Sequence, residues 1–187
     1  MIKINEHAPS FKANAFHKDH IDTIDSDKYR GKWLILFFYP ADFTFVCPTE
    51  LGDLADHYEK FQELGAEIVS VSTDTEFVHK AWHDSSETIK RIKFEMLADP
   101  TGKICREYGT YIEDEGMSLR GTFIIDPDGI LKAYEINDNS IGRGTHELLR
   151  KLQAAQFVRE NGDEVCPVNW QKGSETLKPG LDLVDKI

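Results

Sequence analysis

The hydrophobic pattern of the chain opens with two short alternating segments and one long apolar run. Apolar and polar side chains alternate within residues 11–16 and again around 21–24, which indicates a peripheral hairpin. The run from Trp33 to Tyr39 has no polar break, as is typical of a strand covered on both faces, and Pro40 ends it. We therefore predict that residues 33–39 form the first central strand.

A helix and a second strand follow this run. Apolar side chains recur at intervals of three and four between Leu51 and Leu64, and Gly65 is suited to cap the end of such a helix. Residues 68–71 predict the next strand. Residues 33–72 are therefore expected to form a strand–helix–strand unit whose two strands are parallel.

The second half of the chain predicts another helix and an antiparallel hairpin. A helix is expected around residues 77–82, and a short apolar segment follows at 94–98. The sequence Asp126-Pro127-Asp128-Gly129 separates the apolar segments 122–125 and 130–134, and it is the strongest hairpin signal in the chain. Together these elements predict a central mixed β-sheet flanked by helices, in the α/β or α+β class.

The domain organisation follows from length and from the end of the pattern. A chain of 187 residues with 40% hydrophobic and 29% charged residues is an ordinary single globular domain. A last helix is expected from Thr145 to about Arg159, and the sequence after it is irregular but carries no low-complexity linker. We predict one domain, with residues 1–160 as its body and residues 161–187 as a C-terminal arm.

Charge and hydropathy exclude several kinds of partner. The chain has 33 acidic and 22 basic residues, so its formal charge of −11 repels the phosphates that supply most nucleic-acid affinity. Its longest apolar stretch, from Trp33 to Pro40, is too short to cross a bilayer. Residues 1–6 lack the apolar block of a signal peptide. We expect a cytoplasmic protein that binds neither nucleic acid nor membrane.

Cys47 is the first candidate for thiol chemistry, because it lies between a central strand and the first turn of a helix. Lowering a thiol pKa from about 8.5 to about 6 needs about 3.4 kcal/mol, and a helix N-terminus supplies at most about 2. Glu50 and Asp53 oppose the change because they are acidic. Cys47 is therefore either a buried, inert cysteine or a reactive one that receives a cation from elsewhere in the chain.

The other two cysteines differ in their surroundings. Cys166 lies in the irregular tail, and both it and Cys47 stand in the sequence Val-Cys-Pro. Neither belongs to a Cys-x-x-Cys motif, which excludes a thioredoxin-type dithiol and a zinc ribbon. Two separated thiols suggest a nucleophile and a partner that resolves its oxidised form. Cys105 is expected in a helical turn, where packing in the core is favoured.

Two weaker motifs do not predict a cofactor. His79 and His83 are spaced to share a helix face, but Lys80 stands where the His-Glu-x-x-His zinc motif has glutamate, so a solvated or capping role is favoured. The segment Gly142-Arg143-Gly144 begins a dinucleotide-like pattern, but Glu147 occupies the position of its third glycine. We assign neither motif to ligand binding.

The segment 38–50 resembles the active-site segment of the typical two-cysteine peroxiredoxins. Their Pro-x-x-x-Thr-x-x-Cys motif is complete at Pro40, Thr44 and Cys47. The resemblance extends over essentially the whole chain, including residues 71–74 and 164–167, and is strongest to the bacterial alkyl hydroperoxide reductase peroxidase subunits. It implies a thioredoxin-like fold with an N-terminal hairpin and a C-terminal arm. It also implies peroxide reduction with no metal, flavin or haem cofactor.

The resemblance implies a role for each residue of the motif. Cys47 is the expected peroxidatic thiolate, which attacks the O–O bond and becomes a sulfenic acid. Thr44 is expected to hydrogen-bond the peroxide, and Pro40 to shield the thiolate from water. Arg120 matches the family's active-site arginine and is the expected cation, which Glu50 would orient.

The resemblance also implies partners. Cys166 would be the resolving cysteine, supplied by the other subunit of a homodimer, and such dimers commonly assemble into decameric rings. Hydrogen peroxide and organic hydroperoxides are the expected substrates in antioxidant defence. The reductant would be a flavoprotein disulfide reductase or thioredoxin. Two other functions stay open at this point, namely a ring-forming holdase chaperone and a thioredoxin-like disulfide exchanger, although the absence of Cys-x-x-Cys weighs against the latter.

Overall fold

The computed structural model describes residues 2–184 of the chain. These residues divide into two compact units, one ending at Thr145 and the other beginning at His146. We describe each unit by itself. The expected arrangement of residues 1–160 as a body and 161–187 as an arm of the same domain stays a prediction.

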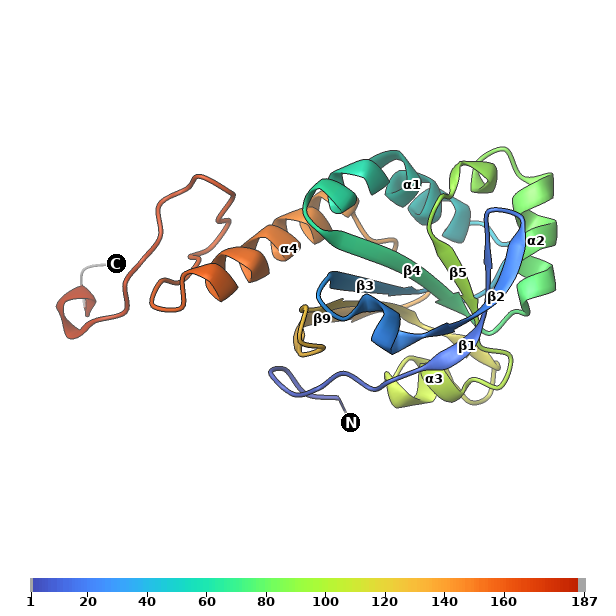
Figure 1. Cartoon of the computed structure of the whole chain (residues 1–187), viewed down its shortest axis with the longest axis horizontal. Coiled ribbons are helices and arrows are strands. Elements are labelled where there is room, and N and C mark those ends of the chain that lie inside the picture. Colours follow the sequence, from blue (N-terminus) through green and yellow to red (C-terminus); the bar gives the residue numbers. More distant parts are fainter. Residues whose placement is uncertain (1, 185–187) are drawn as a thin grey trace. The chain divides into compact units, whose positions relative to one another are not determined.

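The first unit contains a seven-stranded mixed sheet in the order β2-β1-β5-β4-β3-β8-β9 (Figure 1). The pairs β3–β4 and β4–β5 are parallel, and the other neighbours are antiparallel. A separate two-stranded sheet joins β6 to β7. The strands are β1 (Lys12–His17), β2 (His20–Asp25), β3 (Trp33–Phe38), β4 (Ala66–Ser72), β5 (Glu95–Ala98), β6 (Tyr111–Ile112), β7 (Met117–Ser118), β8 (Arg120–Ile125) and β9 (Leu131–Asn137).

Helices cover both faces of this sheet. Figure 1 shows α1 and α2 over one face and α3 over the other. No helix in residues 2–184 is long and apolar enough to span a membrane. The helices are α1 (Cys47–Glu63), α2 (Glu76–Ser85), α3 (Lys103–Glu107) and α4 (Thr145–Glu160), and the short 3-10 helices are η1 (Ser26–Tyr29), η2 (Ile89–Arg91) and η3 (Leu181–Leu183).

The core explains why β3 has no polar residue. Every side chain of β3 is buried, and those of Leu34, Leu36 and Phe38 enter a hydrophobic cluster that also contains Val71 of β4 and Phe123 of β8. The intervening side chains point to the opposite face, because successive residues of a strand alternate. Full burial of one such side chain stabilises the fold by about 1.5–3 kcal/mol. The predicted doubly covered strand is confirmed.

Most sequence expectations agree with these elements. The hairpin β1–β2, the parallel unit β3-α1-β4 and the hairpin β8–β9 are all confirmed. Helix α1 begins at Cys47, four residues before its first predicted apolar position. Pro48 is tolerated there because the N–H groups of the first helical turn have no hydrogen-bond partner within the helix. Gly65 follows the helix with φ +67°, as a C-terminal cap requires.

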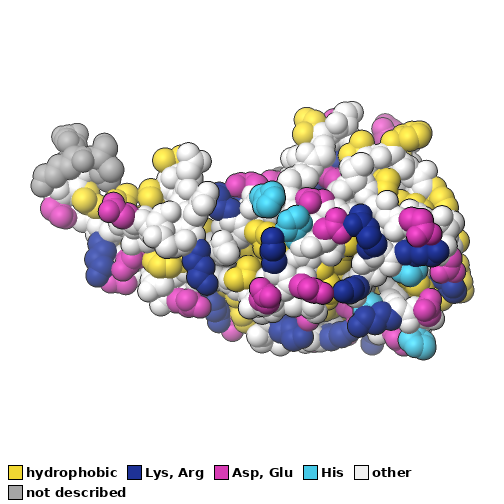
Figure 2. Space-filling view, turned by 90° about the horizontal axis from the view of Figure 1, so that it is seen from above, with side chains coloured by type: hydrophobic (Ala, Val, Ile, Leu, Met, Phe, Trp, Pro, Cys, Tyr) yellow, Lys and Arg dark blue, Asp and Glu magenta, His cyan; other side chains and the backbone are white. Residues whose placement is uncertain are grey.

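The second unit consists of α4 from His146 onward and a tail with little regular structure. One isolated antiparallel bridge joins Val165 to Leu177, and η3 is a single short turn. This agrees with the predicted last helix and irregular tail. Figure 2 shows that acidic and basic side chains are interspersed on the face it draws, without a broad basic surface there.

Candidate active site

The loop between β3 and α1 is held by hydrogen bonds to neighbouring elements. Within the loop, the Thr44 hydroxyl donates to the Ala41 carbonyl at 2.9 Å. The Asp42 amide donates to the Asp74 carboxylate at 2.8 Å, and the Tyr39 hydroxyl donates to the Asp42 carboxylate at 2.6 Å. The backbone after β3 is therefore tied to the end of β4 before it enters α1.

A buried histidine anchors the same loop. The His79 side chain is fully buried in α2, where Nδ1 lies 2.7 Å from the Asp42 carboxylate and Nε2 lies 3.2 Å from the Leu97 carbonyl. The predicted solvated or capping role of His79 is therefore wrong. His79 and Trp82 are three residues apart and are both buried, so they lie on the face of α2 that turns inward. Within residues 2–184 no group of His, Cys, Asp and Glu is suited to hold a metal ion.

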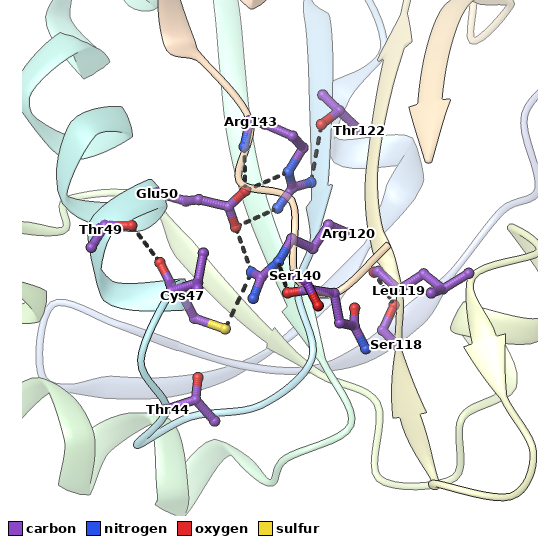
Figure 3. A network of polar contacts seen from close by, with 12 residues as sticks. Thr44, Cys47, Thr49, Glu50, Ser118, Leu119, Arg120, Thr122, Ser140 and Arg143 are labelled. Carbon is purple, nitrogen blue, oxygen red and sulfur yellow. Dashed lines mark hydrogen bonds and ion pairs between the residues drawn. The ribbon is translucent and has the colours of Figure 1, made fainter. Parts of the chain in front are cut away.

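Cys47 is the first residue of α1 and is fully buried. An N–H of Arg120, which opens β8, lies 3.4 Å from its Sγ (Figure 3). The strand pairing explains this meeting, because β8 runs antiparallel to β3 and so begins at the edge where β3 ends. The cation that a reactive Cys47 requires is therefore in contact with the sulfur.

The charge next to the thiol is set by two arginines and one carboxylate. The buried Glu50 carboxylate accepts from Arg120 at 2.7 Å and from the Arg143 side chain at 2.9 and 3.0 Å. Two guanidinium cations against one carboxylate leave one positive charge, which a thiolate on Cys47 would neutralise.

Glu50 is ionised in this arrangement. Burial raises its pKa, but hydrogen bonds and charge from Arg143, together with the charge of Arg120, hold the pKa of Glu50 below its ordinary value. The sequence reading that Glu50 opposes a thiolate counts its charge alone. In the fold, Glu50 also accepts hydrogen bonds from two arginines, one of which contacts the Cys47 sulfur.

Arg143 is the residue that sequence reasoning left outside the site. Its backbone N–H donates to Glu50 at 2.8 Å, and its side chain donates to the Gly121 carbonyl and to the Thr122 hydroxyl. Its guanidinium carbon lies 3.4 Å from the centre of the Phe37 ring. The flanking Gly142 and Gly144 are the only local signal, and they belong to an incomplete dinucleotide-like pattern. Nothing nearby in the sequence points to Glu50.

The remaining residues of the motif lie on the segment that leads from β3 to Cys47. Figure 3 shows Thr44 on the loop that leads to the cysteine, and its half-buried hydroxyl oxygen can still accept a hydrogen bond. Pro40 is buried at the end of β3 and has no N–H to offer. The Arg120 Nε–H donates to the Asn139 carbonyl at 2.8 Å, which fixes the direction of its guanidinium.

The other cysteines occupy different environments. Cys105 is buried in α3, where burial and the nearby Asp99 raise its pKa to about 12, so it is a core residue as predicted. Cys166 belongs to the second unit and is partly exposed. Its Sγ lies 4.0 Å from the Ala154 carbonyl, burial raises its pKa, and the charge of Arg150 opposes that rise. Its pairing with Cys47 stays a prediction.

Comparison with known proteins gives consistent matches. Residues 4–134 match the AhpC/TSA family, and residues 154–186 match the C-terminal domain of 1-Cys peroxiredoxin. Alkyl hydroperoxide reductase C of Salmonella typhimurium is 52% identical over 187 residues, which is the full length of both chains. The protein of the same name from Staphylococcus saprophyticus is 51% identical over 189 residues, again with both chains fully covered.

Solved structures agree with these matches. The crystal structure of Enterococcus faecalis AhpC has a TM-score of 0.86 and 52% identity, covering 89% of this chain and all of that one. The reduced 2-Cys peroxiredoxin of Plasmodium vivax has a TM-score of 0.92 and 35% identity, covering 96% of this chain and 94% of that one. The sheet flanked by helices is therefore the thioredoxin-like fold of these structures, as the resemblance implied.

Proposed function

The chain belongs to the AhpC/TSA family of peroxiredoxins, and on that premise we propose how its residues reduce a hydroperoxide. The family and the full-length relatives make it a thiol-dependent peroxidase with an antioxidant function. Holdase and disulfide-exchange functions are not favoured by these relatives. The contact between Arg120 and the Cys47 sulfur carries the proposal at the level of residues.

The first step is attack by the Cys47 thiolate. Sulfur bonds to one peroxide oxygen, the O–O bond breaks, and the departing oxygen leaves as water or an alcohol after taking a proton. Cys47 is oxidised to a sulfenic acid while the peroxide is reduced. Arg120 stabilises the thiolate and the charge that develops on the oxygens, and the Thr44 hydroxyl binds the peroxide. Pro40 keeps water from the sulfur.

Glu50 supports this step without touching the substrate. Because it binds both Arg120 and Arg143, it holds the first guanidinium where its N–H reaches Sγ. The charge of a buried arginine without such a carboxylate would be unpaired, and an unpaired buried charge destabilises the folded protein. Glu50 is therefore a positioning residue in the proposal.

The second step forms a disulfide. The thiolate of the partner subunit's Cys166 attacks the Cys47 sulfenic sulfur, an S–S bond forms, and hydroxide leaves as water after protonation. A protein reductant then restores both thiols. We propose a homodimer that assembles into a decameric ring in the cytoplasm. The substrates are hydrogen peroxide and organic hydroperoxides, and the reductant is a flavoprotein disulfide reductase or thioredoxin.

One equivalent of peroxide followed by a non-reducing gel tests the mechanism. The parent and Cys105→Ser should form a linked dimer, whereas Cys47→Ser and Cys166→Ser should not. Sustained turnover with dithiothreitol and peroxide should be lost in Cys47→Ser. A linked dimer that depends on Cys105, or normal turnover in Cys47→Ser, would overturn the proposal.

A further inference from the structure

The turn that carries Cys166 is folded back onto α4 within the second unit. The Asn161 amide donates to the Phe157 carbonyl at 2.8 Å, and the Val165 amide donates to the Leu177 carbonyl at 2.9 Å. The Trp170 amide closes the turn by donating to the Pro167 carbonyl at 3.2 Å. Cys166 therefore lies between two residues, Val165 and Pro167, whose backbones are held by hydrogen bonds.

One face of α4 receives this turn. Arg150, Ala154 and Phe157 are spaced by four and three residues, so they lie above one another on the helix. Ala154 approaches the Cys166 sulfur with its carbonyl, and the ring of Phe157 packs 5.1 Å from that of Trp170. Trp170 is only 2% exposed. Arg150 completes the stripe by donating to the Trp170 carbonyl at 3.2 Å.

The direction of the Arg150 guanidinium is fixed by a second contact. Its Nε and one terminal nitrogen donate to the two carboxylate oxygens of Glu147 at 2.7 and 2.9 Å. This bidentate pair turns the remaining nitrogen toward Trp170. An open hollow of about 640 Å³ lies beside Arg150 and is lined also by Gln153, Gln171 and Lys172, so a substitution at Arg150 meets solvent rather than tight packing.

The two acidic residues that come shortly before Cys166 in the sequence have partners of their own. Glu164 accepts from the Thr176 hydroxyl, and Asp163 lies 3.8 Å from Lys178. Among the residues that the structure describes, Arg150 is the charged group whose field acts on the Cys166 thiol. Burial works against a thiolate at this position, and the positive charge of Arg150 favours it.

We propose that Arg150 is a positioning residue for Cys166, which holds the turn 166–170 on α4 and keeps a positive charge close to the resolving thiol. The inference rests on the proposed role of Cys166 in disulfide formation. A thiolate is the attacking species in that step, so the fraction of Cys166 that is ionised limits its rate. Glu147 acts through Arg150 by fixing its direction.

The test separates this role from the peroxidase mechanism by using no peroxide. In a Cys47→Ser/Cys105→Ser background, Cys166 is the only thiol, and its alkylation by iodoacetamide is followed against pH. We expect Arg150→Gln to move the midpoint to higher pH and to slow alkylation at pH 7 by about threefold, as a shift of half a pH unit implies. Arg150→Lys keeps the positive charge but loses the planar guanidinium that pairs with Glu147. The midpoint of its alkylation profile should therefore lie between those of the parent and Arg150→Gln.

Lys151→Gln is the matched control, because it removes the same charge one position along the helix. The Lys151 ammonium lies 3.9 Å from Glu147, whereas the hydrogen bond to the Trp170 carbonyl comes from Arg150. Its midpoint should equal that of the parent. Equal midpoints in Arg150→Gln and Lys151→Gln, or a midpoint for Arg150→Lys at or above that of Arg150→Gln, would overturn the proposal.

A second measurement uses the native cysteines and a single turnover. Arg150→Gln should leave the first oxidation of Cys47 unchanged and slow the appearance of the Cys47–Cys166 disulfide about threefold. Slowing of both steps would mean that the substitution disturbs the whole fold, and this would contradict a specific role. If the parent forms no such disulfide, the proposed mechanism fails, whereas the alkylation profile still reports on Arg150.

Discussion

At the residue scale, the proposed chemistry depends on the buried guanidinium of Arg120, which touches the buried thiol of Cys47. Without Arg120, only the N-terminus of α1 would stabilise the Cys47 thiolate. The free energy that a helix terminus supplies falls short of the required stabilisation by more than about 1 kcal/mol. We predict that Arg120→Ala slows the alkylation of Cys47 at neutral pH and lowers the second-order rate with peroxide by at least about tenfold. The pH profile of Cys47 alkylation in a Cys105→Ser/Cys166→Ser background measures the first effect. A profile identical to the parent's would assign the role to Arg143.

Glu50 allows a stability prediction at the same scale. Its pKa is lowered in the folded state, so its contribution is present above the unfolded value of about 4.3 and is lost as pH falls through the folded value. We predict that Glu50→Gln lowers the free energy of unfolding by about 3–5 kcal/mol at pH 7, because two buried cations lose their shared partner. Urea unfolding at pH 7 and below pH 4 checks this. The difference from the parent should shrink at acid pH, and a constant difference would contradict the linkage.

At the scale of elements, α1 is placed by how it begins and how it ends. Its N-terminal turn presents Cys47 to Arg120, and Gly65 turns the chain sharply into β4 with φ +67°. A side chain at Gly65 would meet no neighbour within 4 Å, so only its backbone conformation resists substitution. We predict that Gly65→Ala destabilises the protein by about 1–2 kcal/mol. Gly162, which also has open space but no positive φ, is the control, and Gly162→Ala should show no loss in thermal unfolding.

At the scale of the whole molecule, a single chain leaves large apolar side chains exposed in both units. Phe45 and Phe77 are 92% and 67% exposed in the first unit, and Val168 and Leu181 are 88% and 93% exposed in the second. Aromatic side chains are enriched in protein–protein interfaces, so Phe45 and Phe77 are candidates for contacts with a second copy of the chain. We predict that sedimentation velocity of the reduced protein at about 10 µM shows a dimer or a larger ring. A monomer under these conditions would contradict the proposed assembly.

Local sequence was sufficient to predict most of the architecture and to propose Cys47 as the reactive thiol. The strand at residues 33–39 and the helix at 51–64 were predicted from the spacing of their hydrophobic residues. That spacing follows from which face of a strand or helix is buried, and it can be recognised within a few neighbouring residues. The motif at Pro40, Thr44 and Cys47 is likewise contiguous. Charge arithmetic further predicted that Cys47, if reactive, needs a cation from elsewhere in the chain.

The resemblance named Arg120 as that cation and Glu50 as its partner, and the fold added their geometry and the second arginine, Arg143. Arg120 is 73 positions from Cys47 and Arg143 is 93 positions from Glu50. Arg120 meets α1 because β8 pairs with β3, and Arg143 meets α1 from the loop between β9 and α4. A long separation in sequence also explains why the burial of His79 was not predicted, since its partner Asp42 is 37 positions away. Periodicity reports which face of an element is buried. It does not report what that face contacts, because such contacts depend on the order of strands in the sheet and on the path of the loops between them.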